Sequence, residues 1–136
     1  MFTEKEVAYL RSQPLARLAT VSLDAQPDVV PVGFEFDGEY FYIGGYDVTR
    51  TRKYKNVEQG STHVALVVDD LVSVDPWNPR GIRAYGIAEL VEREGYAGEG
   101  IYLRIEPRVS WSWNIEPASE DGFSVNKVIH ERVAGR

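Results

Sequence analysis

The sequence predicts a mainly β protein, a small barrel of six to seven antiparallel strands with a few short helices. Two observations predict this class. Short stretches of β-prone, often alternating residues recur along the chain and are separated by turn residues. Between the third and fourth expected strands lies one segment of helical character, an order typical of small barrels. With 136 residues the chain is long enough for one core, and we expect a single domain over residues 1–136.

The N-terminal third is expected to form a helix and three strands. Thr3 and Glu6 have the spacing of a capping box, so a short amphipathic helix should begin there and end before Pro14. We expect this helix to plug one end of the barrel. Three strands should follow, with turns at Asp24–Pro27 and Asp37-Gly38: Leu15–Leu23, Val29–Phe36 and Tyr40–Ile43.

The remaining strands are expected in the second half of the chain. Val64–Val68 is a continuous apolar run, typical of a strand buried on both faces. Ile82–Val91 and Ile101–Ile115 alternate and predict a fifth and a sixth strand, the sixth kinked or bulged near Pro107. The last dozen residues could form a short strand or helix. Proline, glycine and charge predict three loops: Asp69–Arg80, Glu92–Gly100 and Glu116–Gly122.

The composition excludes several classes of function. A formal net charge of -6 disfavours binding to nucleic acid or to an anionic membrane. The chain has no cysteine, and its only histidines are His63 and His130, so we expect no thiol chemistry and no metal site. Neither a targeting segment nor an apolar run of about 18 residues is evident, so we expect a cytoplasmic protein.

A basic segment is the most informative feature of the sequence. Arg50–Asn56 holds four of the fifteen lysines and arginines, and Thr49 and Gly60 could begin and end a helix around it. Residues three or four apart share a helix face. Its cations and first-turn amide groups would then point towards one anion, which predicts a phosphate-binding corner. A solvated helix face is the alternative. One face would carry four side chains: Thr49, Arg52, Lys53 and Asn56.

Two further features have both a structural and a ligand-binding interpretation. Pro31 and Gly33 lie within an expected strand, where either a bulge or the close approach of a flat ligand would explain them. Trp111 and Trp113 share a strand face; core packing would bury both, and exposure would indicate a dimer surface or a stacking wall. The sequence has no nucleophile, phosphate-loop or dinucleotide motif, so any chemistry has to be carried by a bound cofactor.

The order of several short motifs resembles a known family, the split β-barrel flavin and deazaflavin oxidoreductases, which are the pyridoxamine 5'-phosphate oxidase-like proteins. The resemblance covers about residues 1–115. Two further stretches, Asp70–Trp77 and Ile105–Trp111, and the pair Arg80-Gly81 are similar to the branch that uses coenzyme F420 and includes a tetracycline-pathway reductase. The motifs that carry the family resemblance are Arg17–Val21, Val30–Phe34, Tyr40–Gly44, Arg52–Val57 and Val67–Asp70.

The resemblance implies a split, FMN-binding-like barrel that forms a homodimer with cofactor sites at the interface. It implies transfer of a hydride from reduced coenzyme F420 to an unsaturated small molecule. An FMN-dependent oxidase or flavin reductase is one alternative, and a non-catalytic flavin or deazaflavin carrier is another. No catalytic residue is assigned, although Tyr54, Tyr85 and His63 are conceivable proton donors. The expected cofactor-binding residues are Thr20, Pro31, Val32, Gly33, Arg50, Arg52, Lys53, Asn56 and Trp77.

Overall fold

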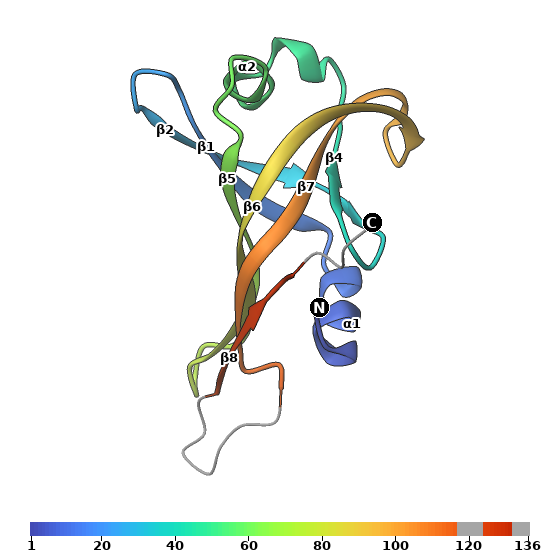
Figure 1. Cartoon of the computed structure of the whole chain (residues 1–136). Coiled ribbons are helices and arrows are strands. Elements are labelled where there is room, and N and C mark those ends of the chain that lie inside the picture. The colour runs from blue at the N-terminus through green and yellow to red at the C-terminus, as the bar shows by residue number, and fades with distance from the viewer. Residues whose placement is uncertain (117–123, 132–136) are drawn as a thin grey trace.

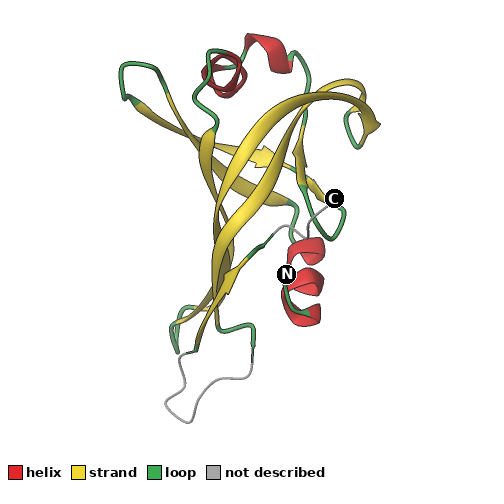
Figure 2. Ribbon diagram, viewed as in Figure 1, coloured by secondary structure: helices red, strands yellow, loops and turns green. Residues whose placement is uncertain are grey.

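The computed structural model describes residues 1–116 and 124–131. It is built on one antiparallel sheet, and its helices lie at the periphery (Figures 1 and 2). The mainly β prediction is therefore confirmed. In chain order the elements are α1 (Glu4–Ser12), β1 (Leu15–Val21), β2 (Pro27–Gly33), β3 (Glu35–Phe36), β4 (Phe41–Ile43), the 3-10 turn η1 (Val48–Arg50), α2 (Arg52–Glu58), β5 (His63–Ser73), β6 (Asn78–Gly95), β7 (Gly98–Trp113) and β8 (Val125–Ile129).

The two ends of the sheet are joined by the chain and not by a strand ladder in the described residues. Its strand order is β2-β1-β5-β6-β7-β4-β3, with β8 paired to β7, so the two ends of the path are consecutive in sequence. Phe34 joins them, and it divides the expected strand Val29–Phe36 into β2 and β3. This division accounts for eight strands in the described residues where six to seven were expected. Of the two possibilities left open for the last dozen residues, a short strand or a helix, the structure shows the strand, β8.

Two of the expected loops are mostly strand. The ladder between β5 and β6 continues past the apolar run as far as Ser73 and Asn78, and Pro79 lies opposite Leu71. The ladder between β6 and β7 continues to the pair Gly95 and Gly98. The predictions of long loops at Asp69–Arg80 and Glu92–Gly100 were therefore wrong, because backbone pairing needs no apolar side chains and both hairpins extend past the core. The expected loop Glu116–Gly122 lies outside the described residues except for Glu116.

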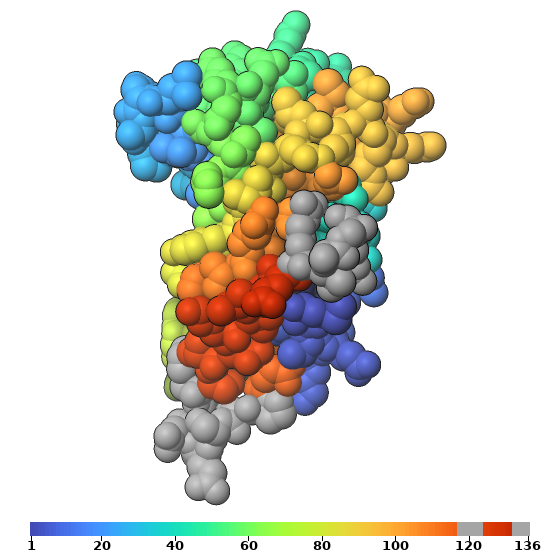
Figure 3. All heavy atoms as spheres, in the orientation of Figure 1, coloured from blue at the N-terminus to red at the C-terminus, as the bar shows by residue number. Residues whose placement is uncertain are grey.

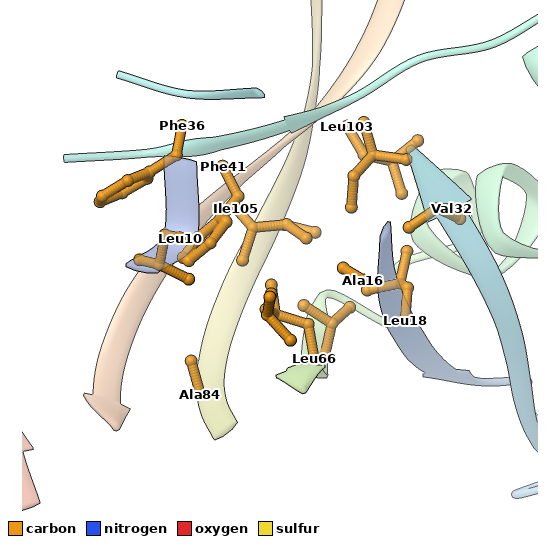
Figure 4. Packing of buried hydrophobic residues seen from close by; sticks show 14 of the residues in the cluster. Leu10, Ala16, Leu18, Val32, Phe36, Phe41, Leu66, Ala84, Leu103 and Ile105 are labelled. Atoms are coloured by element: carbon orange, nitrogen blue, oxygen red, sulfur yellow. The ribbon is translucent and has the colours of Figure 1, made fainter. Parts of the chain in front are cut away.

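The core is formed by the buried side chains of the sheet strands together with residues of α1, η1 and α2. Figure 4 shows Leu10 of α1 beside Phe36 and Phe41, with Ile105 next to them. The capping box is confirmed, because Thr3 and Glu6 exchange the two expected hydrogen bonds. The Glu6 carboxylate is fully buried and accepts hydrogen bonds from the Ser112 hydroxyl and from Asn126 of β8. Figure 3 shows β8 in red lying on the surface beside α1 in blue.

A second polar cluster joins α1 to the long hairpin of β5 and β6. The Tyr9 hydroxyl donates to Asp70 Oδ1 at 2.6 Å. The Arg80 guanidinium donates to both oxygens of Asp70, through Nε at 2.8 Å and Nη2 at 3.1 Å, and lies 4.9 Å from the centre of the Tyr9 ring. The hydrogen bonds from Arg80 hold the pKa of Asp70 below its usual range. The helix is thus clamped to the sheet by a fully paired carboxylate.

A bulge in β7 changes which side chains face the core. Gly86 pairs with Pro107 and Tyr85 with Val109, so Arg108 is an extra residue on β7. The bulge predicted near Pro107 is confirmed. After it the serines at 110 and 112 are buried, and both Trp111 and Trp113 turn to the outer face, where they are partly exposed. The two tryptophans therefore share one face, as expected, and it is not the core face.

Candidate functional site

The basic segment forms a helix that begins two residues later than expected. Thr49 lies inside η1, whose Val48 is buried, and Thr51 caps α2 instead by accepting a hydrogen bond from the amide of Tyr54 at 3.3 Å. The prediction of Thr49 as the cap was wrong, because the buried Val48 sits in a separate helical turn. The other end is as predicted: α2 ends at Glu58, and Gly60 has a φ of +106°, a conformation that favours glycine.

Two expected site residues meet where α2 packs on β1. Asn56 is fully buried, and its Nδ2 donates to the Thr20 hydroxyl at 2.9 Å. Thr20 is itself 4% exposed. The carbonyl oxygen Oδ1 of Asn56 has no hydrogen-bond partner within the described part of the chain. Buried polar atoms are almost always paired, so this oxygen marks the junction as one whose hydrogen bonding is incomplete.

The cations of the segment differ in their exposure. Arg50 and Arg52 are exposed, whereas Lys53 is partly buried. Burial lowers the pKa of Lys53, and the nearby charge of Asp28 opposes that shift. Within residues 1–116 and 124–131, Lys53 makes no ion pair. An anion placed beside it would favour its charged form.

Carboxylates flank the basic segment, one of them nearby in sequence and two from a distant turn. Arg50 lies 3.8 Å from Asp47, measured from Nε to Oδ2. A cleft of about 360 Å³ beside Arg52 is lined by Asp24 and Asp28 together with Ser22 and Gln26. The corner therefore carries charges of both signs, with the cations on α2 and η1 and the carboxylates on neighbouring turns.

A larger groove of about 580 Å³ lies on the outer face of β1, β5, β6 and β7, next to the start of β5. Most of its lining is apolar, including Val21, Ala65, Ile87 and Val109. Two of the conceivable proton donors, His63 and Tyr85, and Arg108 supply polar side chains to this lining. Thr20, one of the expected cofactor-binding residues, also lines the groove, but its side chain lies on the buried face of β1 with Ala16 and Leu18. Sites for small molecules are typically concave and mostly apolar, with a few polar groups, and this groove has that character.

The strand β2 presents its expected residues in two directions. Pro31 and Gly33 are exposed, whereas the side chain of Val32 is buried in the core. Any contact of Val32 with a ligand would therefore come from its backbone. The ladder between β1 and β2 has no register shift, so no bulge explains Pro31. Proline is tolerated here because β2 is the edge of the sheet path.

Trp77 lies far from the other expected site residues. It is 68% exposed at the tip of the hairpin formed by β5 and β6. In Figure 1 that tip and α2 lie at opposite ends of the molecule. One copy of the chain therefore does not bring Trp77 to the basic segment.

The remaining candidates have contacts that define their roles more closely. His130 packs on the Phe2 ring with centroids 4.3 Å apart, and its Nε2 lies 2.8 Å from the Ser110 hydroxyl. Burial lowers the pKa of His130 to about 4, so its ring is neutral at neutral pH. Tyr54 hydrogen-bonds to Glu58, which raises the pKa of its hydroxyl. No group of residues that could hold a metal ion occurs in the described ranges.

Sequence reasoning missed two residues beside this region. Arg108 is the bulged residue of β7, and it lines the groove. Tyr96 lies in what was expected to be a loop, and its hydroxyl contacts the backbone of Gly33 and Gly44. The only sequence signal for Arg108 was its position next to Pro107, and none indicated the contacts of Tyr96.

The helices in the described residues are all too short to span a bilayer.

An antiparallel sheet whose ends are joined by consecutive strands defines the protein as a split β-barrel. Residues 2–129 match the model of the family described as pyridoxamine 5'-phosphate oxidase. The chain therefore belongs to the pyridoxamine 5'-phosphate oxidase family, and the suspected resemblance is confirmed.

The similar proteins include a named reductase. The chain is 37% identical over 137 residues to the 5a,11a-dehydrotetracycline/5a,11a-dehydrooxytetracycline reductase of Streptomyces rimosus subsp. rimosus, and the match covers 96% of this chain and 95% of the relative. A conserved hypothetical protein of Mycobacterium tuberculosis superposes with a TM-score of 0.67 at 22% identity, covering 99% of this chain and 94% of that one. A structure described as an F420 reductase has a TM-score of 0.59 at 22% identity, covering 80% and 98%. The two structures support the fold.

Proposed function

We propose that the protein is a coenzyme F420-dependent oxidoreductase that reduces an unsaturated small molecule. The family and the reductase relative support the coarser assignment, an oxidoreductase of this family. One observation carries the finer one: an apolar groove lies along β1 at Thr20, and the Thr20 side chain, on the buried face of that strand, contacts the helix that carries Lys53 and Arg52. Such an arrangement fits a ligand with a flat ring and an anionic tail.

Residues where α2 packs on β1 would bind different parts of the cofactor. Lys53, Arg52 and Arg50 would face the phosphate, where a charge-assisted hydrogen bond to a lysine or arginine is roughly twice as strong as a neutral one. Thr20 and the exposed side of β2 at Pro31 and Gly33 would face the ring. Asn56 Oδ1, which has no partner among the described residues, is a hydrogen-bond acceptor, so it could take a donor such as a ring N–H of the ligand and not the phosphate.

The chain's own contribution to the reaction would be orientation and proton transfer. Reduced F420 supplies a hydride when it is bound, and the protein positions the acceptor against it. Tyr85 and His63 both line the groove, so either is placed to donate a proton to the reduced product. Tyr54 is the weaker candidate, because its hydroxyl already bonds to Glu58.

Assembly as a homodimer would explain the position of Trp77 and of the outer aromatic residues. Tyr85 is 47% exposed, and its ring lies 5.1 Å from that of Trp111. Arg83 lies 4.2 Å from the centre of the Trp111 ring, so an aromatic and cationic cluster covers the outer face of β6 and β7. Interfaces are enriched in aromatic residues and arginine. In such a dimer Trp77 could reach the site of the second copy.

One observation favours FMN as the alternative cofactor. F420 carries a phosphodiester and a polyglutamate tail, which four cations would suit better than a lone phosphate. The carboxylates of Asp24, Asp28 and Asp47 reduce the positive charge available to such a tail. A single terminal phosphate needs less positive charge, and an FMN-dependent oxidase or flavin reductase of the same fold would then result.

A binding titration distinguishes these cofactors. Oxidised and reduced F420 and FMN are titrated into the protein and followed by fluorescence or calorimetry. We expect F420 to bind at least tenfold more tightly than FMN; the reverse order would support the alternative. Reduced F420 carrying deuterium at its hydride-donating carbon is then mixed with electron-poor acceptors under single-turnover conditions. Tight binding with no deuterium in any product would indicate a non-catalytic carrier.

A further inference from the structure

In the part of the chain that the structure describes, no strand ladder joins the β2 edge of the split barrel to β4, which leaves a seam between them. β2 ends at Gly33 and β4 ends at Ile43, and these two strands are not neighbours in the sheet. The hairpin of β6 and β7 reaches across this seam. Figure 1 shows its tip, in yellow and orange, curving over the barrel towards β4.

The hydroxyl of Tyr96, in the turn of that hairpin, bridges the seam. It donates to the carbonyl oxygen of Gly33 at 2.8 Å and accepts from the amide of Gly44, also at 2.8 Å. One side chain thereby satisfies a backbone acceptor on the β2 side and a backbone donor on the β4 side. Ladder hydrogen bonds would do the same if the two strands were paired.

The turn that carries Tyr96 is itself held in place. The Tyr96 ring packs edge to face on Tyr102, with centroids 5.8 Å apart, and the Tyr102 hydroxyl bonds to the backbone of Ala97 and Gly98. Arg93 lies 3.7 Å from the centre of the Tyr42 ring of β4. These contacts fix the position of the Tyr96 hydroxyl.

Gly44 is required for this close approach. A Cβ atom built on Gly44 would lie 2.5 Å from the Tyr102 ring, so a larger residue at this position would displace that ring. Gly44 also begins the connection that leads through η1 into the basic helix, and Gly33 ends the strand proposed to face the cofactor ring. The two groups bridged by Tyr96 thus belong to the two halves of the proposed site.

We propose that Tyr96 is a positioning residue that fixes the Pro31–Gly33 strand relative to the basic segment Arg50–Asn56, by bridging Gly33 and Gly44 with its hydroxyl. This inference rests on the proposed function. A ligand with a ring at one end and a phosphate at the other gains affinity when both half-sites are held at the correct separation, because less ordering is needed on binding. A ligand that uses only one half-site gains nothing from the bridge.

The test compares Tyr96→Phe with the parent and with Tyr40→Phe. Tyr40 is a matched control, since its ring lies 4.8 Å from the Arg104 guanidinium and its hydroxyl makes no hydrogen bond to any described residue. Dissociation constants are measured for F420, for FMN and for riboflavin, which has the ring without the phosphate. Exchange of the Gly44 amide with deuterium is followed by NMR in the absence of any cofactor.

For Tyr96→Phe we expect about tenfold weaker binding of the phosphate-bearing cofactor that the parent prefers, which corresponds to about 1.4 kcal/mol. Riboflavin binding should change less than twofold, and the Gly44 amide should exchange at least fivefold faster. Tyr40→Phe should match the parent in all three measurements.

Three results would overturn the inference. An equal loss for riboflavin and FMN would indicate general loosening of the fold. Unchanged exchange at Gly44 would show that the hydroxyl does not hold the seam. Unchanged affinity for the phosphate-bearing cofactor would show that the seam does not position the site. If the parent binds neither F420 nor FMN, the proposed function is wrong and so is the positioning role that rests on it. The exchange rate of the Gly44 amide would still show whether the Tyr96 hydroxyl bridges Gly33 and Gly44.

Discussion

In the described residues, the two α-helices are joined to the same sheet by polar contacts of opposite character. At α1, Asp70 accepts hydrogen bonds from Tyr9 and from both ends of the Arg80 fork. At α2, Asn56 uses its amide nitrogen on Thr20 and leaves its carbonyl oxygen unpaired. A carboxylate with this many donors acts as a clamp, whereas an incompletely paired junction has capacity left for a ligand.

The pKa directions at the two junctions agree with this difference. Hydrogen bonds from Arg80 lower the pKa of Asp70, so the fold favours its charged form. Burial lowers the pKa of Lys53, so the fold disfavours its charged form. The first junction is electrostatically complete, and the second would be improved by an anion.

The largest effect is expected from Lys53→Ala, which tests whether the α2 junction binds an anion. Cofactor binding should weaken by roughly 1.5 to 3 kcal/mol, the range for a hydrogen bond to a charged group. Affinity should fall with added salt. The affinity of the parent should also fall as the pH is raised, because Lys53 loses its charge. Since burial lowers the pKa of Lys53, this fall should begin at a lower pH than it would for a lysine of ordinary pKa. Calorimetric titration measures all three.

Lys55→Ala is the matched control, because Lys55 is exposed on the same helix. It should bind the cofactor within about threefold of the parent after correction for net charge. Equal losses in the two variants would show that α2 attracts anions only through its general charge, and the proposed corner would be wrong.

Thr20→Val should give the next largest effect, on folding. Valine has nearly the same shape, but it leaves Asn56 Nδ2 as a second buried unpaired group, at a cost of about 2 kcal/mol. Urea unfolding measures the change, and Thr49→Val on the exposed turn is the control. The double variant Thr20→Val/Asn56→Leu should recover part of the loss, because no buried polar group of the pair remains. If Thr20→Val unfolds like the parent, this contact does not hold α2.

Asp70→Asn tests the α1 junction and should cost about 1 kcal/mol of stability, because the pair is partly exposed and the bonds are only weakened. The pKa of Asp70 is lower in the folded state than the ordinary aspartate pKa of 3.8. Ionised Asp70 therefore stabilises the fold fully above pH 3.8, and this stabilisation is lost as the pH falls through the folded-state pKa. The parent should therefore lose stability below about pH 4 more steeply than Asp70→Asn. Cofactor affinity should be unchanged in the variant; a loss above threefold would contradict the separation of the two junctions.

Trp77→Ala should have the smallest effect on folding, within about 0.5 kcal/mol, because the ring is largely exposed. If the second copy supplies this ring to the site, cofactor binding should still weaken by about 1 kcal/mol. Light scattering should also show a dimer of about twice 15.4 kDa. Val74→Ala, on the same hairpin tip, is the control for binding. Unchanged affinity in Trp77→Ala would remove Trp77 from the site.

The sequence was most informative where local chemistry decides the structure. The capping box at Thr3, the bulge at Pro107 and the end of α2 before Gly60 each follow from a few neighbouring residues, and each was predicted. The lengths of the two long hairpins were not predicted, because their ladders depend on the partner strand and not on apolar pattern.

The candidate site was predictable in its residues more than in its geometry. The meeting of Thr20 and Asn56 joins positions 36 residues apart in sequence and follows from packing of α2 on β1. The carboxylates of Asp24 and Asp28 come from a distant turn of the chain, so no local pattern reveals that they lie beside the basic segment. The bridge made by Tyr96 depends on the extension of the hairpin of β6 and β7 through Glu92–Gly100, where the sequence predicted a loop.

The edge of the split barrel has a consequence for how copies of this protein avoid aggregation. An open edge strand can recruit a strand from another chain, and β2 is such an edge. Pro27 and Pro31 both lie in β2 and have no amide hydrogen to offer an incoming strand. A fibril that grew by adding strands to this edge would meet two missing hydrogen bonds within seven residues. Replacing both prolines would therefore remove a protection against misassembly as well as two exposed side chains.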